Sequence, residues 1–253
     1  MTVASPTTTS MSRRSCATDD STVTFRIRRV TTTRAGGVSK RPFDTFNLGD
    51  HVGDDPKAVA ANRSRLAEAI GVDDLVWMNQ VHSDHVEVVD AARVYDDTDA
   101  LVTATPRLAL AVITADCVPV LLGDARNGVV GAVHAGRVGA AKGIVARTVE
   151  AMVGLGADVA DISALLGPAV SGRNYEVPYE MADDVEAVLP GSITTTTRGT
   201  VGLDLRAGIA RQLAGLGVTA IDIDPRCTVD DKNLFSHRRG APTGRLASVV
   251  WME

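Results

Sequence analysis

Short, mostly apolar runs of strand length recur along the chain and alternate with segments of helical periodicity. Alternation of polar and apolar residues over Thr22–Thr32 predicts a half-buried strand near the start. Later apolar runs predict buried strands at Leu75–Met78, Ala109–Ile113, Val129–Val133 and Ile162–Leu166, and further strands are predicted at Ala220–Ile223 and Leu246–Trp251. Because strands and helices are interspersed throughout, the pattern is typical of the α/β class.

Apolar residues at helical spacing predict the helices between these strands. One helix begins at Pro56, where preceding acidic residues and a proline are typical of a helix N-terminus. Others are predicted over Ala140–Leu155, over Tyr179–Leu189, and from an Asp204 cap to Gly217. No linker or repeat interrupts residues 22–253, so we predict a single domain there.

Residues 1–21 differ in composition from the rest of the chain. They are rich in Ser and Thr, and no apolar stretch follows Arg13 and Arg14, so they do not form a signal peptide. We predict a disordered tail.

Composition narrows the class of protein. The chain has 253 residues, of which 45% are hydrophobic, and a net charge of −5, which argues against a nucleic-acid partner. No apolar run reaches the roughly 18 residues of a membrane span, so we predict no membrane partner. The three cysteines, Cys16, Cys117 and Cys227, are too few and scattered for a disulfide framework. A reducing, cytoplasmic location fits best.

Two histidines and a cysteine lie where apolar runs finish. His82 follows Leu75–Met78, Cys117 follows Ala109–Ile113, and His134 ends the next run. Three such ligands would make a soft-metal site with one coordination position open. The separations match no compact zinc-finger spacing, so a local structural zinc is not indicated. Taken singly, a buried cysteine is usually a small apolar residue, and a histidine at a strand end is usually a hydrogen-bonded structural one.

Asp116, beside Cys117, is a candidate for orienting a ligand or a water that acts as a base. Because neighbouring residues in a strand point to opposite faces, a role in capping the turn is an equal alternative.

A long glycine-rich loop precedes the first helix. It contains Asn47, and its length favours either a tolerant surface loop or backbone that approaches a ligand. Asn62 and Arg63 fall on the apolar stripe of the helix, so we expect both to hold this loop, with direct ligand contact as the alternative. Asn47 and Arg63 are therefore candidate substrate-binding residues.

A second polar group lies near the C-terminus, within Leu234–Arg245. Arg238, Arg239 and Arg245 stand close together beside turn-forming glycines in an acidic protein. Guanidinium groups bind phosphate in a bidentate manner, so this segment is a candidate anion site, and a solvated basic loop is the alternative.

Several longer motifs carry a resemblance to a known family. They are TRAGGVS at 33–39, FNLG at 46–49, VGDD at 52–55, Asn62-Arg63, QVH at 80–82, DALVT at 99–103, TADCVPV at 114–120, VHAG at 133–136, Gly167-Pro168 with YEV at 175–177, and the segment from Phe235 to Arg245. Together they resemble the laccase-domain family, long labelled multicopper polyphenol oxidases and now regarded as purine nucleoside phosphorylases.

The resemblance implies a layered α/β/β/α sandwich with mixed sheets, similar to the catalytic domain of a deamidating bacterial toxin. It implies zinc bound by His82, Cys117 and His134, with copper as the other possibility. It further implies phosphorolysis of adenosine, inosine and methylthioadenosine with inorganic phosphate as co-substrate, and adenosine deamination. The expected partners are then small-molecule purine nucleosides.

The chain departs from the family pattern after His134. Many members have Trp-Arg where this chain has Arg137-Val138, so Arg137 is expected to supply the charge from the neighbouring position or to change the substrate preference. The segment 167–175 lacks the cysteines often found there, which disfavours a multicopper centre.

Other classes of function stay open on the sequence. Cys117 and His134 would suit a metal-free cysteine hydrolase or amidase, with the histidine as base. Copper-dependent phenol oxidation is the third class.

Overall fold

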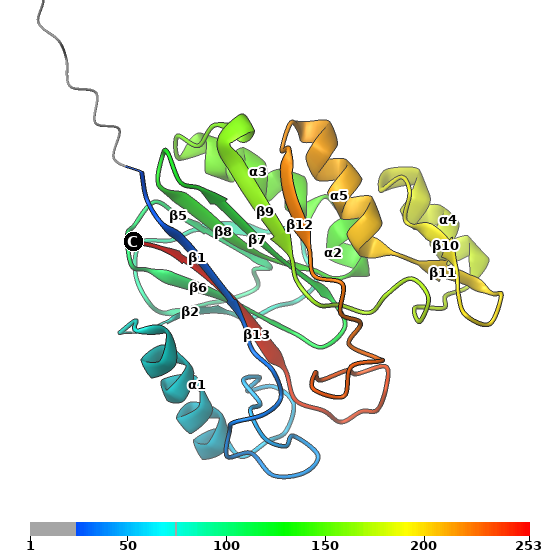
Figure 1. Cartoon of the computed structure of the whole chain (residues 1–253), viewed down its shortest axis with the longest axis horizontal. Coiled ribbons are helices and arrows are strands. Elements are labelled where there is room, and N and C mark those ends of the chain that lie inside the picture. Colours follow the sequence, from blue (N-terminus) through cyan, green and yellow to red (C-terminus); the bar gives the residue numbers. More distant parts are fainter. Residues whose placement is uncertain (1–23, 74) are drawn as a thin grey trace, which may run out of the picture.

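Two mixed β-sheets lie face to face in the computed structural model, which describes residues 24–73 and 75–253 (Figure 1). The first sheet has the strand order β1-β13-β6-β2-β4. Its strands are β1 (Ile27–Thr31), β13 (Leu246–Met252), β6 (Ala109–Thr114), β2 (Leu75–Met78) and β4 (Val94–Tyr95). The central strand β6 is antiparallel to β13 and parallel to β2, so this sheet is mixed.

The second sheet has the strand order β12-β9-β7-β8-β5-β3. Its strands are β12 (Ala220–Ile223), β9 (Ile162–Leu166), β7 (Val118–Asp124), β8 (Val129–Ala135), β5 (Ala100–Thr103) and β3 (Val86–Val88). The pairs at its two edges are parallel and the inner pairs are antiparallel.

The alternation of side chains along β6 shows how the layers form. Leu110 and Val112 pack between the sheets against Leu121 and Val130. Ala109, Ala111 and Ile113 point the other way and pack with Leu66 of α1 (Pro56–Ile70). A strand covered on both faces needs apolar residues at every position, which is why this run lacks polar interruptions.

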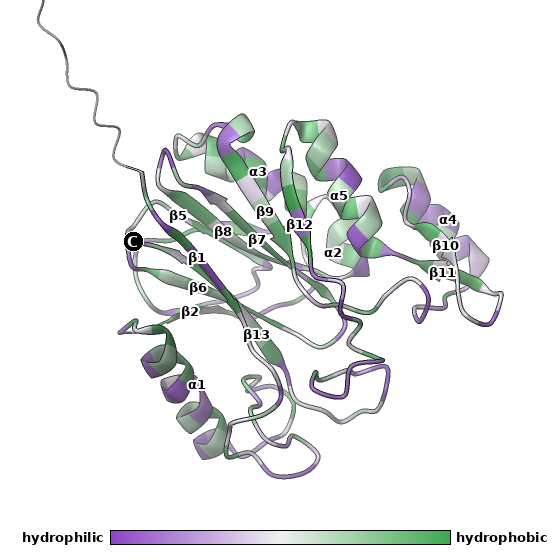
Figure 2. Cartoon of the chain, in the orientation of Figure 1, coloured by the Kyte–Doolittle hydropathy of each residue, from purple (hydrophilic) through white to green (hydrophobic). Residues whose placement is uncertain are grey.

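Helices cover the outer faces of both sheets. Helix α1 lies on the first sheet, and α3 (Ile144–Gly154) and α5 (Leu205–Leu216) cover the second (Figure 1). The remaining elements are α2 (Arg137–Ala141), α4 (Tyr179–Val188), the 3-10 turn η1 (Val159–Asp161), and the strand pair β10 (Ile193–Thr195) and β11 (Val201–Leu203). The expected α/β/β/α sandwich is confirmed, and Figure 2 shows its strands as largely hydrophobic.

Some predicted elements differ from the structure. The helix predicted over Ala140–Leu155 is two helices, because Gly143 adopts a φ of 87° that ends α2 before α3 begins. Strand β7 was missed because Pro119 and Gly123 interrupt its apolar run. The first strand begins at Ile27 rather than Thr22, and the tail predicted for residues 1–21, with Cys16, lies outside the described residues. Over 24–73 and 75–253, no helix has the length and apolarity needed to cross a membrane.

Candidate metal centre and active-site cavity

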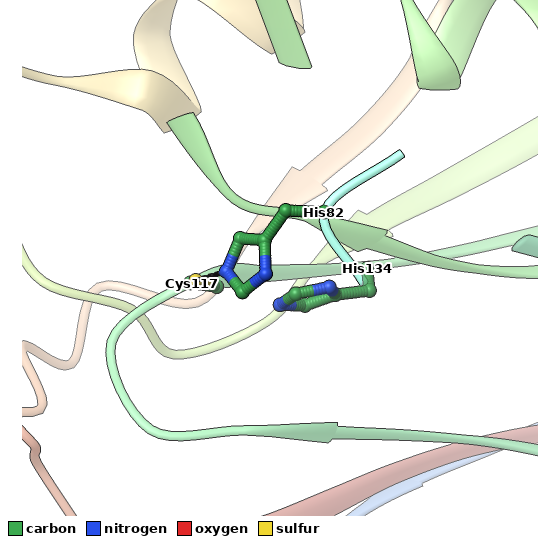
Figure 3. A group of neighbouring side chains, drawn as sticks. All are labelled: His82, Cys117 and His134. Atoms are coloured by element: carbon green, nitrogen blue, oxygen red, sulfur yellow. Dashed lines mark hydrogen bonds between the residues drawn. The ribbon is translucent and has the colours of Figure 1, made fainter. Parts of the chain in front are cut away.

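His82, Cys117 and His134 converge at one end of the two sheets (Figure 3). Each offers one ligand atom, and these atoms all lie within 4.8 Å of one another. His82 lies in the loop after β2, and His134 lies within β8. Cys117 directly precedes β7, so it begins a strand rather than ending one as the sequence pattern implied. The fold thus joins residues from three separate segments.

Asp99 holds both histidines of the triad in place. Its buried carboxylate accepts a 2.7 Å hydrogen bond from Nδ1 of His134. It also accepts the backbone N–H groups of Val81, His82 and Ser83 at 3.2, 3.0 and 2.6 Å. His82 has a φ of 60°, an uncommon value for a residue with a Cβ, and these bonds hold it there. One carboxylate therefore fixes the His134 ring and the loop that carries His82.

Charges in the centre favour a thiolate. Burial raises the pKa of Cys117, but the His134 charge and hydrogen bonds from both histidines outweigh it and lower this pKa to about 6. Burial lowers the pKa of His134, but the Cys117 thiolate and the Asp99 carboxylate raise it to about 9. For Asp99, burial raises the pKa and the bonds from His134 and Ser83 lower it to about 2. Near neutral pH, Cys117 and Asp99 are therefore anionic beside His134.

The backbone at Gly136 comes close to two of the candidate ligands. A Cβ at Gly136 would lie 2.7 Å from Cδ2 of His82 and 3.1 Å from Sγ of Cys117. Only glycine lets the backbone come this close without displacing a candidate ligand.

The donor set fits zinc. Thiolate and imidazole are usual zinc ligands, at about 2.3 and 2.0–2.1 Å, and a three-ligand set leaves a position for substrate or water. The Asp99 bond leaves Nε2 of His134 as the ligand atom, which is the carboxylate–histidine arrangement typical of metal sites. This triad is the one such group of three or more donors found in the described part of the chain, whereas a multicopper centre needs donors for more than one ion.

The triad opens into a cavity of about 530 Å³, within the range of small-molecule sites. Three more of the predicted site residues line it, namely Asp116, Arg238 and Arg245. Asn47, Arg63 and Arg239, also predicted from the sequence, do not line it. Other lining residues were not among the predicted site residues, namely His51, Gln80, Tyr175 and His237. Arg137, which replaces the usual tryptophan of the family motif, also lines the cavity.

Asp116 fastens the C-terminal segment to the centre. It has a φ of 102°, and its carboxylate accepts the Thr228 hydroxyl at 2.5 Å and the Arg238 backbone N–H at 2.7 Å. The Arg238 guanidinium lies 4.7 Å from the centre of the Tyr175 ring. Asp116 therefore positions Arg238 over the cavity, and its catalytic role stays a prediction.

Arg245 lies on the wall formed by the first sheet. Its backbone N–H donates to Oδ1 of Asn47 at 2.8 Å, and its guanidinium donates to the carbonyls of Thr243 and Gly244. Burial lowers the pKa of His51, and the nearby Arg245 charge lowers it further. Asn47 thus acts on the cavity through the position of Arg245.

Two of the arginines predicted to bind substrate, Arg239 and Arg63, bond to other parts of the protein and do not line the cavity. The Arg239 guanidinium donates to the carbonyls of Thr228, Val229, Asp231 and Leu234. Arg63 donates to the Leu48 carbonyl and pairs with Asp50, while Asn62 holds the loop through Ser39, Thr45 and Asn47. The expectation that Asn62 and Arg63 hold the glycine-rich loop is therefore confirmed.

The cavity residues missed by sequence reasoning carried weak signals. Gln80 lies in the QVH motif, and its side chain exchanges hydrogen bonds of 2.8 and 2.9 Å with the Ile113 backbone, which fixes the loop leading to His82. Tyr175 begins the YEV motif. Burial raises its pKa, while the charges of Arg137 and Arg238 oppose that shift. The motifs marked these positions, but only the fold shows that they face one cavity.

Comparison with known proteins places the chain in a family. The family described as multi-copper polyphenol oxidoreductase laccase matches residues 28–253. The chain belongs to this laccase family. A purine nucleoside phosphorylase of Mycobacterium tuberculosis is 72% identical over 239 residues, covering 93% of this chain and 96% of the relative. A purine nucleoside phosphorylase of Corynebacterium glutamicum is 60% identical over 232 residues, covering 89% and 94%.

Two solved structures share the fold of this chain. Bacillus licheniformis hypothetical protein YfiH has a TM-score of 0.83 at 32% identity, covering 90% of this chain and 93% of its own. Neisseria meningitidis protein NMB0706, titled a DUF152 protein, has a TM-score of 0.81 at 35% identity, covering 90% and 94%. The resemblance drawn from the sequence motifs is thus confirmed, and the chain belongs to a family whose relatives carry enzyme names.

Proposed function

We propose that this protein is a zinc-dependent purine nucleoside phosphorylase. It cleaves adenosine, inosine and methylthioadenosine to the free base and a pentose 1-phosphate. It also deaminates adenosine, and it acts in the cytoplasm. The names of the relatives support the phosphorylase activity. The observation that carries the proposal is one cavity that joins a three-donor metal site to three arginines, Arg137, Arg238 and Arg245. None of these arginines has a carboxylate partner among the described residues.

Phosphorolysis requires a phosphate dianion held beside C1′ of the ribose. Arg245 is suited to bind it, because its guanidinium is partly buried and its backbone is fixed by Asn47. Arg238 adds a second positive charge at the same cavity. Preorganised charges of this kind stabilise the transition state without reorganising during the reaction. Arg239 supports this arrangement by fixing the loop rather than by touching phosphate.

Another part of the cavity lining suits a purine. Tyr175, Val170 and Leu205 supply an aromatic and apolar surface, and the cavity volume of about 530 Å³ fits a small molecule. We place the base on this wall and the phosphate on the Arg245 wall, with the ribose between them.

Held by His82, Cys117 and His134, a zinc ion would supply Lewis-acid chemistry and activation of water near neutral pH. Asp99 keeps Nε2 of His134 directed into the centre, and Gln80 fixes the loop that leads to His82. Phosphorolysis occurs at C1′ and deamination at C6, which are different atoms of one nucleoside. We therefore assign the phosphate contact to Arg245 and the deamination centre to the triad.

A metal-free cysteine hydrolase is the second candidate. The pKa of Cys117, lowered to about 6, and its Sγ at 3.8 Å from Nε2 of His82 are features of an activated nucleophile. Copper-dependent phenol oxidation, which the family description names, is the third.

Elemental analysis of the purified protein separates these classes. About one zinc per chain supports the proposal, a metal-free protein with a thiol reactive to iodoacetamide supports the hydrolase, and stoichiometric copper supports the oxidase. The same sample is assayed with inosine, and hypoxanthine is followed by chromatography with and without phosphate. Phosphate-dependent release of hypoxanthine supports the proposal, and its absence in zinc-loaded protein contradicts it.

A further inference from the structure

Arg137 is the cavity arginine to which the proposed phosphate contact gives no role. It is the first residue of α2, it is half-buried, and it lines the cavity together with Arg238 and Arg245. The guanidinium groups of Arg238 and Arg245 each donate to backbone carbonyls. In the described part of the chain, neither a carboxylate nor a backbone carbonyl holds the Arg137 guanidinium. Its donors can therefore bond to a molecule in the cavity.

Two neighbours show where Arg137 lies. Gly136, directly before it, comes so close to the triad that a Cβ there would lie 3.1 Å from Sγ of Cys117. At the far end of the side chain, burial raises the pKa of Tyr175, and the Arg137 charge and a hydrogen bond from its guanidinium oppose that rise. The guanidinium therefore lies at the Tyr175 hydroxyl, close to the triad and on the wall assigned to the base.

This position indicates which part of a purine Arg137 meets. The base lies against Tyr175, and deamination at the triad requires C6 to face that centre. Arg137 then lies at the edge of the base that carries the substituent on C6 and the neighbouring N7. A guanidinium has several N–H donors, so the bond to Tyr175 leaves donors for this edge.

Hypoxanthine and adenine differ at this edge. In hypoxanthine O6 and N7 are both acceptors, the same pair to which an arginine donates two bonds when it contacts guanine in DNA. In adenine N7 accepts but the 6-amino group is a donor, so it cannot accept from a guanidinium. A positive charge at N7 also stabilises the negative charge that the base gains as its bond to C1′ breaks.

We propose that Arg137 donates to O6 and N7 of the base and makes phosphorolysis selective for 6-oxopurine nucleosides such as inosine over adenosine. This selectivity rests on the proposed phosphorylase function and names its preferred class of substrate. Deamination of adenosine yields inosine, so the product of one reaction is the better substrate of the other.

Binding measurements test the contact apart from either reaction. Inosine and 7-deazainosine are titrated by calorimetry into zinc-loaded protein without phosphate, where neither can be deaminated or phosphorolysed. Wild type should bind inosine about 10-fold or more tightly than 7-deazainosine, which lacks the N7 acceptor. Arg137→Gln should weaken the binding of inosine and bring the two affinities together.

Initial rates at saturating phosphate give the second readout. Hypoxanthine release from inosine is compared with adenine release from adenosine, and adenine is quantified directly so that deaminated adenosine is not counted. Wild type should favour inosine by about 10-fold or more in kcat/KM, and Arg137→Gln should lose most of that preference. Arg137→Lys keeps the charge but lacks the paired donors of a guanidinium, so it should lose the preference as well.

Arg238→Gln is the matched control. Arg238 lines the same cavity, and its guanidinium lies 4.7 Å from the centre of the Tyr175 ring, but we assign its charge to phosphate. Arg238→Gln should slow the cleavage of inosine and adenosine by the same factor. It should also keep the difference in affinity between inosine and 7-deazainosine.

The outcomes separate this inference from the function it rests on. If zinc-loaded wild type releases neither base in phosphate, the phosphorylase proposal fails, while calorimetry still tests the contact with the base. Equal affinities of wild type for inosine and 7-deazainosine would refute the contact with N7. An Arg137→Gln variant that keeps the preference for inosine, or that raises only the KM for phosphate, would also refute the inference.

Discussion

Asp99 accepts a 2.7 Å hydrogen bond from His134, and this single contact connects the fold to the metal centre. The same carboxylate binds the backbone of the loop that carries His82. Two candidate ligands from separate segments thus share one buried anion. Supporting carboxylates of this kind fix the ring and raise its basicity.

Replacing Asp99 with Asn should weaken zinc binding. Loss of a supporting carboxylate typically reduces metal affinity by about 10–100-fold. Zinc affinity would be measured by competition with a chromogenic chelator. Asp96→Asn, at an exposed position in the same segment, is the control and should bind zinc as wild type does. An unchanged affinity in Asp99→Asn would show that His134 needs no support from it.

Cys117→Ala should abolish stoichiometric zinc while the fold is retained. The thiolate is one of only three donors, and the side chain is only partly buried. Metal content and circular dichroism spectra would be compared with wild type. Cys227→Ser removes the other cysteine of the described chain and should keep zinc. Full metal retention in Cys117→Ala would rule out the triad as the zinc site.

Gly136→Ala should weaken metal binding without touching a donor atom. The new methyl group would lie 2.7 Å from the His82 ring, so the ring must move. Gly154→Ala is the matched control, because its methyl group meets nothing within 4 Å. There the substitution should leave zinc binding unchanged. Equal zinc affinity in both variants would contradict the close approach of the Gly136 backbone to the candidate ligands.

Arg245→Gln should raise the KM for phosphate in inosine cleavage more than it weakens nucleoside binding. Removing a bond from a charged group costs about 1.5–3 kcal/mol, so a 10-fold or larger rise is expected. Deamination of adenosine should be spared, because it needs no phosphate. Arg239→Gln should instead lower the unfolding temperature, since that guanidinium holds backbone carbonyls. Equal loss of both reactions in Arg245→Gln would refute the division of roles.

Asp124 should make folding stability depend on pH in the acid range. Burial raises its pKa, but hydrogen bonds from the Asn127 side chain and the backbone of Asn127, Asp158 and Arg126 outweigh burial and lower it. Because the pKa of the folded state is the lower one, the stabilisation is present above the unfolded value of about 3.9 and is lost as pH falls through the folded value.

Urea unfolding of wild type and Asp124→Asn between pH 7 and pH 3 tests this. The variant should be less stable by about 1–3 kcal/mol at pH 7, and the difference should shrink below about pH 4. If the difference in unfolding free energy between wild type and Asp124→Asn grew on acidification, the predicted direction of the Asp124 pKa shift would be contradicted.

The sequence predicted several strands well because each is a short, mainly apolar run. Ile162–Leu166 and Ala220–Ile223 match the structure residue for residue. Strand β7 escaped because Pro119 and Gly123 break its pattern, although it lies in the centre of the second sheet. The hydrophobic pattern cannot show that proline and glycine are tolerated in a strand that is hydrogen-bonded to neighbouring strands on both sides.

For the site, the sequence supplied the candidate ligands but not the residues that hold them in place. Spacing alone could not join His82, Cys117 and His134, since only the packing of two sheets brings them together. Asp99 opens the DALVT motif, but nothing in the sequence showed that its carboxylate would bind His134 and the loop of His82. Arg239 and Arg245 look alike in sequence, yet one is satisfied by backbone carbonyls and the other lines the cavity. Internal pairing of this kind depends on tertiary structure.

Phosphorus NMR of the products tests the central claim most directly. Zinc-loaded protein is mixed with inosine and inorganic phosphate, and the ³¹P spectrum is followed with time. Growth of a ribose 1-phosphate signal at the rate of hypoxanthine release is the predicted result. Hypoxanthine released with no phosphate ester, or no hypoxanthine at all, would contradict the assignment of this cavity to phosphorolysis.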